Sequence, residues 1–189
     1  MHKCYHNYYW KGGKPHGQEL VDPLSPLAYK IVTDPYGKRY SIEKYREGQF
    51  ERIVYDSLLL DFRHLTAANQ MAWQRENLKE DETSLVCLLR NQEDRAILLE
   101  THHFDAGVCL SCAISSIHGL PLATQKLYYQ SKQHLFDGVV LFDLESRPVM
   151  MKTYQVDPLS GEFTTLLKEE WDMQVMPQLL HAFNPLQAG

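Results

Sequence analysis

The sequence predicts an α+β fold that is predominantly antiparallel β-sheet, with one internal helix and one helix near the C-terminal end. Three observations predict it: apolar and polar residues alternate over many short segments, turn residues separate those segments, and only two stretches have a helical composition. The links are short, whereas a parallel crossover needs about a dozen residues, so the strands are expected to pair antiparallel. We expect about ten strands in a barrel-like or curled sheet, because closure removes exposed edges.

The composition is that of an ordinary globular chain. It has 189 residues, of which 44% are hydrophobic and 23% charged, and its formal net charge is -5. This length suits a single domain over 1–189 with its own core. The acidic balance offers no attraction for a phosphate backbone, which argues against nucleic acid as a partner. No apolar run has the length of a signal peptide or a membrane span, so a soluble, cytoplasmic protein is expected.

The first part of the chain divides into an irregular segment and a strand segment. Residues 1–26 are predicted to form an irregular N-terminal arm, because residues 11–17 follow neither the strand period nor the helical period. From Leu27 the period is two, which predicts a β-meander over 27–56. Its first link, residues 34–37, has the Asp-Pro-Tyr-Gly pattern of a type I turn.

The rest of the chain is predicted to hold two helices around a sheet. Residues 57–82 are assigned to a helix and a loop, with Thr66 as the cap of a helix over 66–79 that contains Met71 and several alanine and glutamine residues. The final helix is expected over 169–183. The main antiparallel sheet is expected over 84–168, with strands at 84–91, 95–103, 107–117, 122–130, 138–144, 148–156 and 161–168.

Two cysteines and two histidines form the strongest candidate for a metal site or a reactive site. Cys109 and Cys112 have the spacing of a zinc knuckle, and His102 and His103 precede them. The residues between the cysteines prolong a strand, however, and positions i and i+3 of a strand point to opposite faces. A second pair of ligands is also missing. We therefore predict reduced core cysteines, no metal and no cofactor; any metal would be held by His102, His103, Cys109 and Cys112.

An enzyme site in the same region is an open alternative. His102 or His103 could act as a base oriented by Asp105, with Cys109 as the nucleophile. An apolar setting raises the pKa of a thiol and makes it inert, and Asp105 is equally explained as a turn residue. The chain has neither a phosphate-binding glycine loop nor a nucleophile elbow. The balance of these observations favours a protein without catalytic activity.

A group of aromatic residues near the N-terminus supplies the candidate binding residues, Tyr5, Tyr8, Tyr9 and Trp10. Such rings can anchor a protein interface, or they can pack over a sheet edge. The function expected is non-catalytic binding of another macromolecule, most simply a protein, by an inhibitor, immunity, adaptor or assembly factor. The alternatives are a small-ligand carrier with a barrel pocket and an enzyme with an unfamiliar His/Asp/Cys site.

Overall fold

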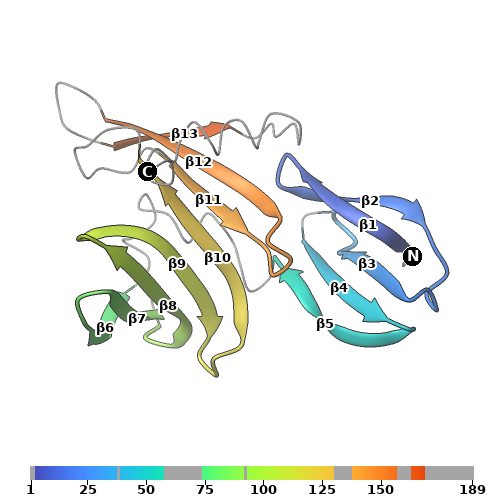
Figure 1. The fold of residues 1–189 in the computed structure, drawn as a ribbon, viewed down its shortest axis with the longest axis horizontal. Helices are drawn as coiled ribbons and strands as arrows, with labels where there is room; N and C mark the ends of the chain where they lie inside the picture. The colour runs from blue at the N-terminus through green and yellow to red at the C-terminus, as the bar shows by residue number, and fades with distance from the viewer. Residues whose placement is uncertain are drawn as a thin grey trace.

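The computed structural model describes residues 3–37, 39–57, 74–91, 93–129, 138–156 and 163–168. These residues form two antiparallel sheets and no helix (Figure 1). The described part of the chain is therefore all-β, and the α+β prediction is wrong. A helix long and apolar enough to cross a membrane is accordingly not found among the described residues.

The smaller sheet has five strands in the order β2-β1-β3-β4-β5. Its strands are β1 (Lys3–Lys11), β2 (Lys14–Leu20), β3 (Leu27–Thr33), β4 (Tyr40–Arg46) and β5 (Gln49–Asp56). The last three pair in sequence order, at the place where the meander was predicted.

The larger sheet has eight strands, and each pairs with its neighbours in the chain, in the order β13-β12-β11-β10-β9-β8-β7-β6. Its strands are β6 (Gln74–Glu80), β7 (Ser84–Arg90), β8 (Ala96–Asp105), β9 (Val108–Ser116), β10 (Pro121–Tyr128), β11 (Gly138–Phe142), β12 (Pro148–Val156) and β13 (Phe163–Lys168). The sheet is strongly curved (Figure 1). Within the described residues β6 and β13 remain as its two edges, so the sheet does not close into the predicted barrel.

Residues 3–20 do not form part of the irregular arm that was predicted for 1–26. Strands β1 and β2 form a hairpin whose turn residues, Gly12 and Gly13, have φ angles of 55° and 68°. Two successive positive φ angles are what a two-residue hairpin turn needs, and glycine adopts them without a steric penalty. Tyr8 and Trp10 point into the core, while Tyr9 lies on the other face of β1. Aromatic residues on both faces conceal the period of two, which is why the sequence did not show the strand.

The predicted internal helix is also wrong where it can be compared with the structure. Residues 74–79 belong to the edge strand β6, which pairs with β7. All β6 side chains are exposed, so no alternation of buried residues marks the strand in the sequence. Its Gln, Arg, Glu, Leu and Lys residues favour a helix by intrinsic propensity, and pairing with β7 overrides that preference. Residues 66–73 and the helix predicted over 169–183 lie outside the described residues.

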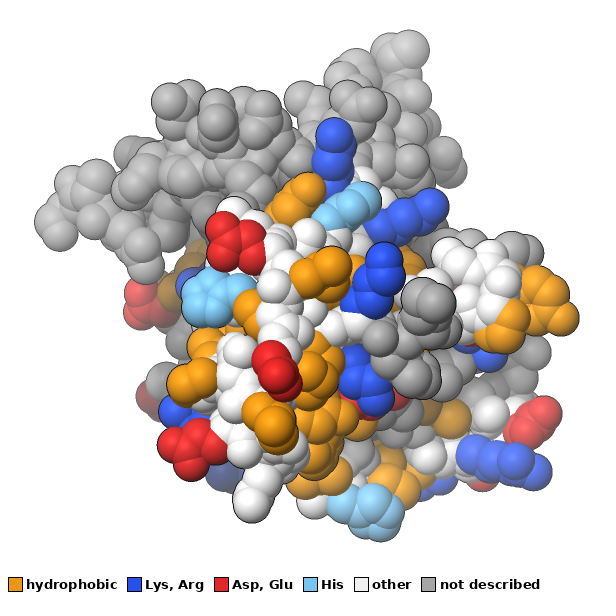
Figure 2. All heavy atoms as spheres, turned by 90° about the vertical axis from the view of Figure 1, so that its right-hand side faces the viewer, with side chains coloured by type: hydrophobic (Ala, Val, Ile, Leu, Met, Phe, Trp, Pro, Cys, Tyr) orange, Lys and Arg blue, Asp and Glu red, His pale blue; other side chains and the backbone are white. Residues whose placement is uncertain are grey.

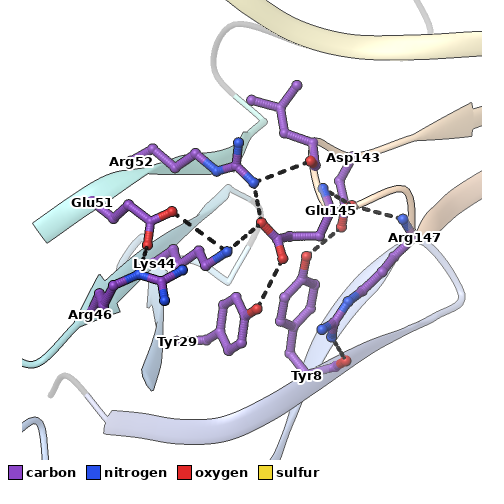
Figure 3. A network of polar contacts seen from close by, with 10 residues as sticks. Tyr8, Tyr29, Lys44, Arg46, Glu51, Arg52, Asp143, Glu145 and Arg147 are labelled. Carbon is purple, nitrogen blue, oxygen red and sulfur yellow. Dashed lines mark hydrogen bonds and ion pairs between the residues drawn. The ribbon is translucent and has the colours of Figure 1, made fainter. Parts of the chain in front are cut away.

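The two sheets share a hydrophobic core. Buried residues of β1, β3, β4 and β5 belong to the same cluster as buried residues of β7 to β12. The joint between the sheets is the turn between β11 and β12, which meets the side chains of β1, β3, β4 and β5 (Figure 3). We call residues 143–147 the joint turn. Because this turn is fixed by the smaller sheet, it holds the adjoining ends of β11 and β12 in place.

The joint turn is held mainly by ionised groups. Asp143 accepts hydrogen bonds from the Tyr8 hydroxyl and the Trp10 indole, at 2.6 and 2.8 Å. Glu145 forms ion pairs with Lys44, at 3.0 Å, and with Arg52. The Arg147 guanidinium lies 3.9 Å from the centre of the Tyr8 ring, which is a cation–π contact.

Candidate metal centre

Three neighbouring strands of the larger sheet place polar side chains in one row. His102 on β8 lies directly opposite Cys112 on β9, and Cys112 lies directly opposite Gln125 on β10. Side chains of directly opposed residues point to the same face of an antiparallel sheet. Glu100 precedes His102 by two residues, so it also points to that face. The row and Glu100 together form the candidate site.

A β-bulge brings the second cysteine to the same histidine. Along β9, Cys112 pairs with His102 and Ser111 with His103, but the next pair joins Cys109 to Phe104, which leaves Leu110 as an extra residue. Both thiols consequently contact the His102 ring: Cys109 Sγ lies 3.9 Å from Nδ1 and Cys112 Sγ 4.0 Å from Nε2. The sequence argument that these cysteines face opposite sides assumed a regular strand and is wrong. A bulge redirects side chains in this way, and bulges are frequent beside active sites.

The bulge is supported by a neighbouring hydroxyl group. Tyr129 donates a hydrogen bond of 2.5 Å to the backbone carbonyl oxygen of Cys109. None of the four cysteines forms a disulfide, so the thiols of Cys109 and Cys112 are available as ligands or as hydrogen-bonding groups.

Glu100 is a buried carboxylate, with only 1% of its surface exposed. Its Oε2 atom lies 3.2 Å from His102 Nε2 and 3.1 Å from a guanidinium nitrogen of Arg75, which reaches in from the edge strand β6. Burying a carboxylate is costly unless positive charge or a metal ion compensates it. The Arg75 guanidinium supplies positive charge to Glu100 here, and His102 adds to it when it is protonated.

The donor atoms of Glu100, His102 and Cys112 all lie within 4.8 Å of one another. In a tetrahedral zinc site, bond lengths of about 2.0–2.3 Å put neighbouring ligand atoms roughly 3.3–3.8 Å apart. The distance from His102 Nε2 to the Glu100 oxygen, 3.2 Å, fits that geometry, and the distance to the Cys112 sulfur, 4.0 Å, requires only a small approach. Carboxylate, imidazole and thiolate are all common zinc ligands.

The ionisable side chains of the site shift one another's pKa values. Hydrogen bonds with Cys109, with Cys112 and with Glu100, in decreasing order of effect, raise the pKa of His102 to about 12 although burial opposes this. Burial raises the pKa of the Cys112 thiol. Without a metal ion, then, a proton stays on His102, between the thiols and the carboxylate. A metal ion would take over the role of that positive charge and release protons from its ligands.

The structure does not bring all the predicted residues together. His103 points to the opposite face of β8 and is exposed, and Asp105 is exposed at the end of the same strand. Sequence reasoning missed Glu100, although its spacing of two from His102 places both on one strand face. It also missed Arg75 and Gln125, because Arg75 was assigned to a helix and no local signal connects Gln125 to Cys112.

The predicted aromatic binding residues are divided between two places. Tyr8 and Trp10 are in the core, with 1% and 2% of their surfaces exposed. Tyr5 and Tyr9 line a hollow of about 400 Å³ over β1, β2 and β3, together with Lys3. Tyr9 stacks on His16, another residue of this hollow, at a centroid distance of 5.4 Å. Viewed from the side of the smaller sheet, charges of both signs are interspersed with apolar side chains (Figure 2).

No family model, no curated protein and no solved structure matches the chain. The class of protein is therefore described by its own geometry: two antiparallel sheets, of which the larger carries a cluster of a buried carboxylate, a buried thiol and a partly buried imidazole.

Proposed function

We propose that this protein is a metalloprotein that binds a divalent ion of the zinc type through Glu100, His102 and Cys112. The observation that carries the proposal is the convergence of three different zinc-binding groups within 4.8 Å on two paired strands. Three protein ligands leave one tetrahedral position for water or another small molecule, which is typical of catalytic rather than structural zinc sites.

Cys109 has a different role in this proposal. It faces Nδ1 of His102, whereas the metal ligands Glu100 and Cys112 face Nε2. A histidine that binds a metal usually has its other ring nitrogen hydrogen-bonded, which fixes the orientation of the ring. Cys109 is therefore a positioning residue, and its loss should weaken metal binding by about 10-fold.

Titration with zinc and with cobalt(II) tests the metal site. Protein purified without chelator should bind one ion per chain, and the cobalt form should show the absorption band of a cobalt–thiolate bond. His102→Ala and Cys112→Ser should each weaken binding by more than about 100-fold, beyond the range of a positioning residue. Cys112→Ser should also abolish the thiolate band, because Cys112 supplies the only sulfur ligand.

The matched controls are His103→Ala and Cys109→Ser. His103 is next to His102 in the chain but exposed on the other face, so its replacement should leave zinc affinity unchanged. The Cys109→Ser protein should keep the thiolate band. Equal zinc affinity in the His102→Ala protein and the unmodified protein would refute the site, as would loss of the band in Cys109→Ser but not in Cys112→Ser.

A second candidate function is binding of a protein partner at the hollow of the smaller sheet. It is favoured by the two tyrosine rings and the stacked histidine that line this hollow, Tyr5, Tyr9 and His16. A photo-reactive phenylalanine in place of Tyr9 should give one discrete cross-linked product in cells, whereas one in place of the exposed Tyr36 should give none. The same products from both positions would contradict a specific surface. The carrier alternative is not proposed, because it requires a closed barrel and the described residues form none.

A further inference from the structure

Two nitrogen-bearing side chains lie beside the proposed metal ligands without being ligands themselves. The first is Arg75, whose guanidinium contacts the Glu100 carboxylate at 3.1 Å and whose side chain is 39% exposed. A guanidinium has five N–H donors in a planar fork, so this contact occupies only part of it. Arg75 can therefore bind a second anionic group from the solvent side while it holds Glu100.

The second side chain is Gln125. Only 7% of its surface is exposed, and its Nε2 atom has no hydrogen-bond partner among the described residues. Buried donors are almost always paired, so an exception calls for an explanation, and a bound ligand is one. Gln125 is directly opposite Cys112 and points to the same face, which places its amide beside the metal position.

Charge balance indicates the kind of ligand. A divalent ion bound by the Glu100 carboxylate and the Cys112 thiolate gives a neutral centre, and the Arg75 guanidinium adds one positive charge. A monoanion neutralises this site, whereas a phosphate dianion leaves an excess negative charge among buried groups, which is unfavourable. A carboxylate also has two oxygen atoms, one for the metal and one for the nitrogen donors, and its plane matches the guanidinium fork.

We propose that the open metal position binds the carboxylate group of a small organic molecule, with Arg75 and Gln125 donating hydrogen bonds to it. This inference rests on the proposed metal site and names the class of ligand that the site takes. Arg75 and Gln125 come from β6 and β10, on either side of the strands that carry the metal ligands. The two donors therefore lie on opposite sides of the metal position, in the direction that runs from strand to strand.

Acetate, added to the cobalt(II) form of the full chain, is the probe that tests the inference. It should change the visible d–d absorption of the cobalt in a saturable way, and inorganic phosphate should do so at least about 10-fold more weakly. Gln125→Leu should weaken acetate binding by about 10-fold while changing cobalt affinity by less than about 3-fold. Arg75→Met should also weaken acetate binding by about 10-fold, measured at saturating cobalt because Arg75 contacts the metal ligand Glu100 as well. Arg75→Lys should recover only part of the affinity, since an ammonium cannot form the planar fork.

Arg90→Met is the control for Arg75, because Arg90 lies on β7, next to the edge strand, and pairs with Glu76 instead of Glu100. Its acetate affinity should equal that of the unmodified protein. Acetate affinities that are equal in all variants would overturn the proposal, since acetate would then bind only adventitiously. Tighter binding of phosphate would overturn the carboxylate assignment. A protein that binds cobalt but not acetate refutes this inference alone, whereas a protein that binds no cobalt refutes the metal site as well.

Discussion

Asp143→Ala is expected to lower the free energy of unfolding by about 4 kcal/mol or more. The Asp143 carboxylate is 3% exposed and accepts four hydrogen bonds. One oxygen accepts from the Tyr8 hydroxyl and the Trp10 indole, and the other from the backbone N–H groups of Glu145 and Arg147. Alanine leaves these donors unpaired, at about 1–3 kcal/mol for each one that stays buried.

This loss is large compared with the total free energy of unfolding of a typical domain, which is about 5–15 kcal/mol. It should be visible as a fall in the denaturation midpoint in urea, followed by tryptophan fluorescence and by circular dichroism. Both signals should move together, because Asp143 connects the two sheets and the transition involves their shared core.

Two graded variants isolate the hydrogen bonds from the change in volume. Asp143→Asn keeps one carbonyl oxygen for the turn but directs an N–H₂ group at the Trp10 indole, which is also a donor, so it should have an intermediate effect. Tyr8→Phe removes one donor and leaves the carboxylate three, and it should cost only about 1–2 kcal/mol. If Asp143→Ala is no more destabilising than Tyr8→Phe, the carboxylate does not hold the joint turn.

The part of the fold that could be predicted is the part that local signals determine. The meander over 27–56 was predicted because its strands alternate and its first turn carries Asp, Pro and Gly at suitable positions. The break between the predicted strands 138–144 and 148–156 also coincides with the turn between β11 and β12. The attachment of this turn to the smaller sheet was not predicted, because Tyr8 and Asp143 are 135 residues apart in the chain. Contacts at that separation leave no local pattern.

The candidate site shows the same limit. The sequence singled out His102, Cys109 and Cys112 by residue type and spacing, and the structure brings them together. The argument that Cys109 and Cys112 face opposite sides of the strand failed at the Leu110 bulge, because neither a glycine nor any other local signal predicts an extra residue there. Gln125 could not be predicted as a site residue for a different reason. Its place in the site depends on its position opposite Cys112 in the strand register and on the lack of a hydrogen-bond partner for its Nε2 atom among the described residues.

Glu145→Ala is the second substitution for which we expect a large effect, about 3 kcal/mol of lost stability. Glu145 pairs with Lys44 at 3.0 Å and with Arg52, and it accepts a hydrogen bond from the Tyr29 hydroxyl (Figure 3). Lys44 is 8% exposed, so removing Glu145 leaves an ammonium group that is largely buried and has lost its closest partner. Breaking a buried pair from one side is far more costly than replacing both partners.

The matched control is Glu51→Ala, which removes the other carboxylate near Lys44, at 3.6 Å. Glu51 is more exposed and otherwise pairs with the exposed Arg46, so its loss should destabilise the protein far less than Glu145→Ala. The double variant Lys44→Met/Glu145→Leu should recover most of the stability lost in Glu145→Ala, because no buried charge is left unpaired. A double variant less stable than Glu145→Ala would contradict this account.

The same ion pairs give stability a dependence on pH that Glu145→Gln should reduce. Burial alone would raise the pKa of Glu145, but hydrogen bonds from Arg52, Lys44 and Tyr29 outweigh it and lower the pKa. A carboxylate with a lowered pKa in the folded state contributes stability above its unfolded pKa, about 4.3, and loses that contribution as the pH falls towards its folded pKa. Urea midpoints measured from pH 6 down to pH 3 should therefore fall less steeply for Glu145→Gln than for the unmodified protein. Parallel curves for the two proteins would show that Glu145 ionises equally well in the folded and unfolded chains, and that its ion pairs with Lys44 and Arg52 add nothing to stability.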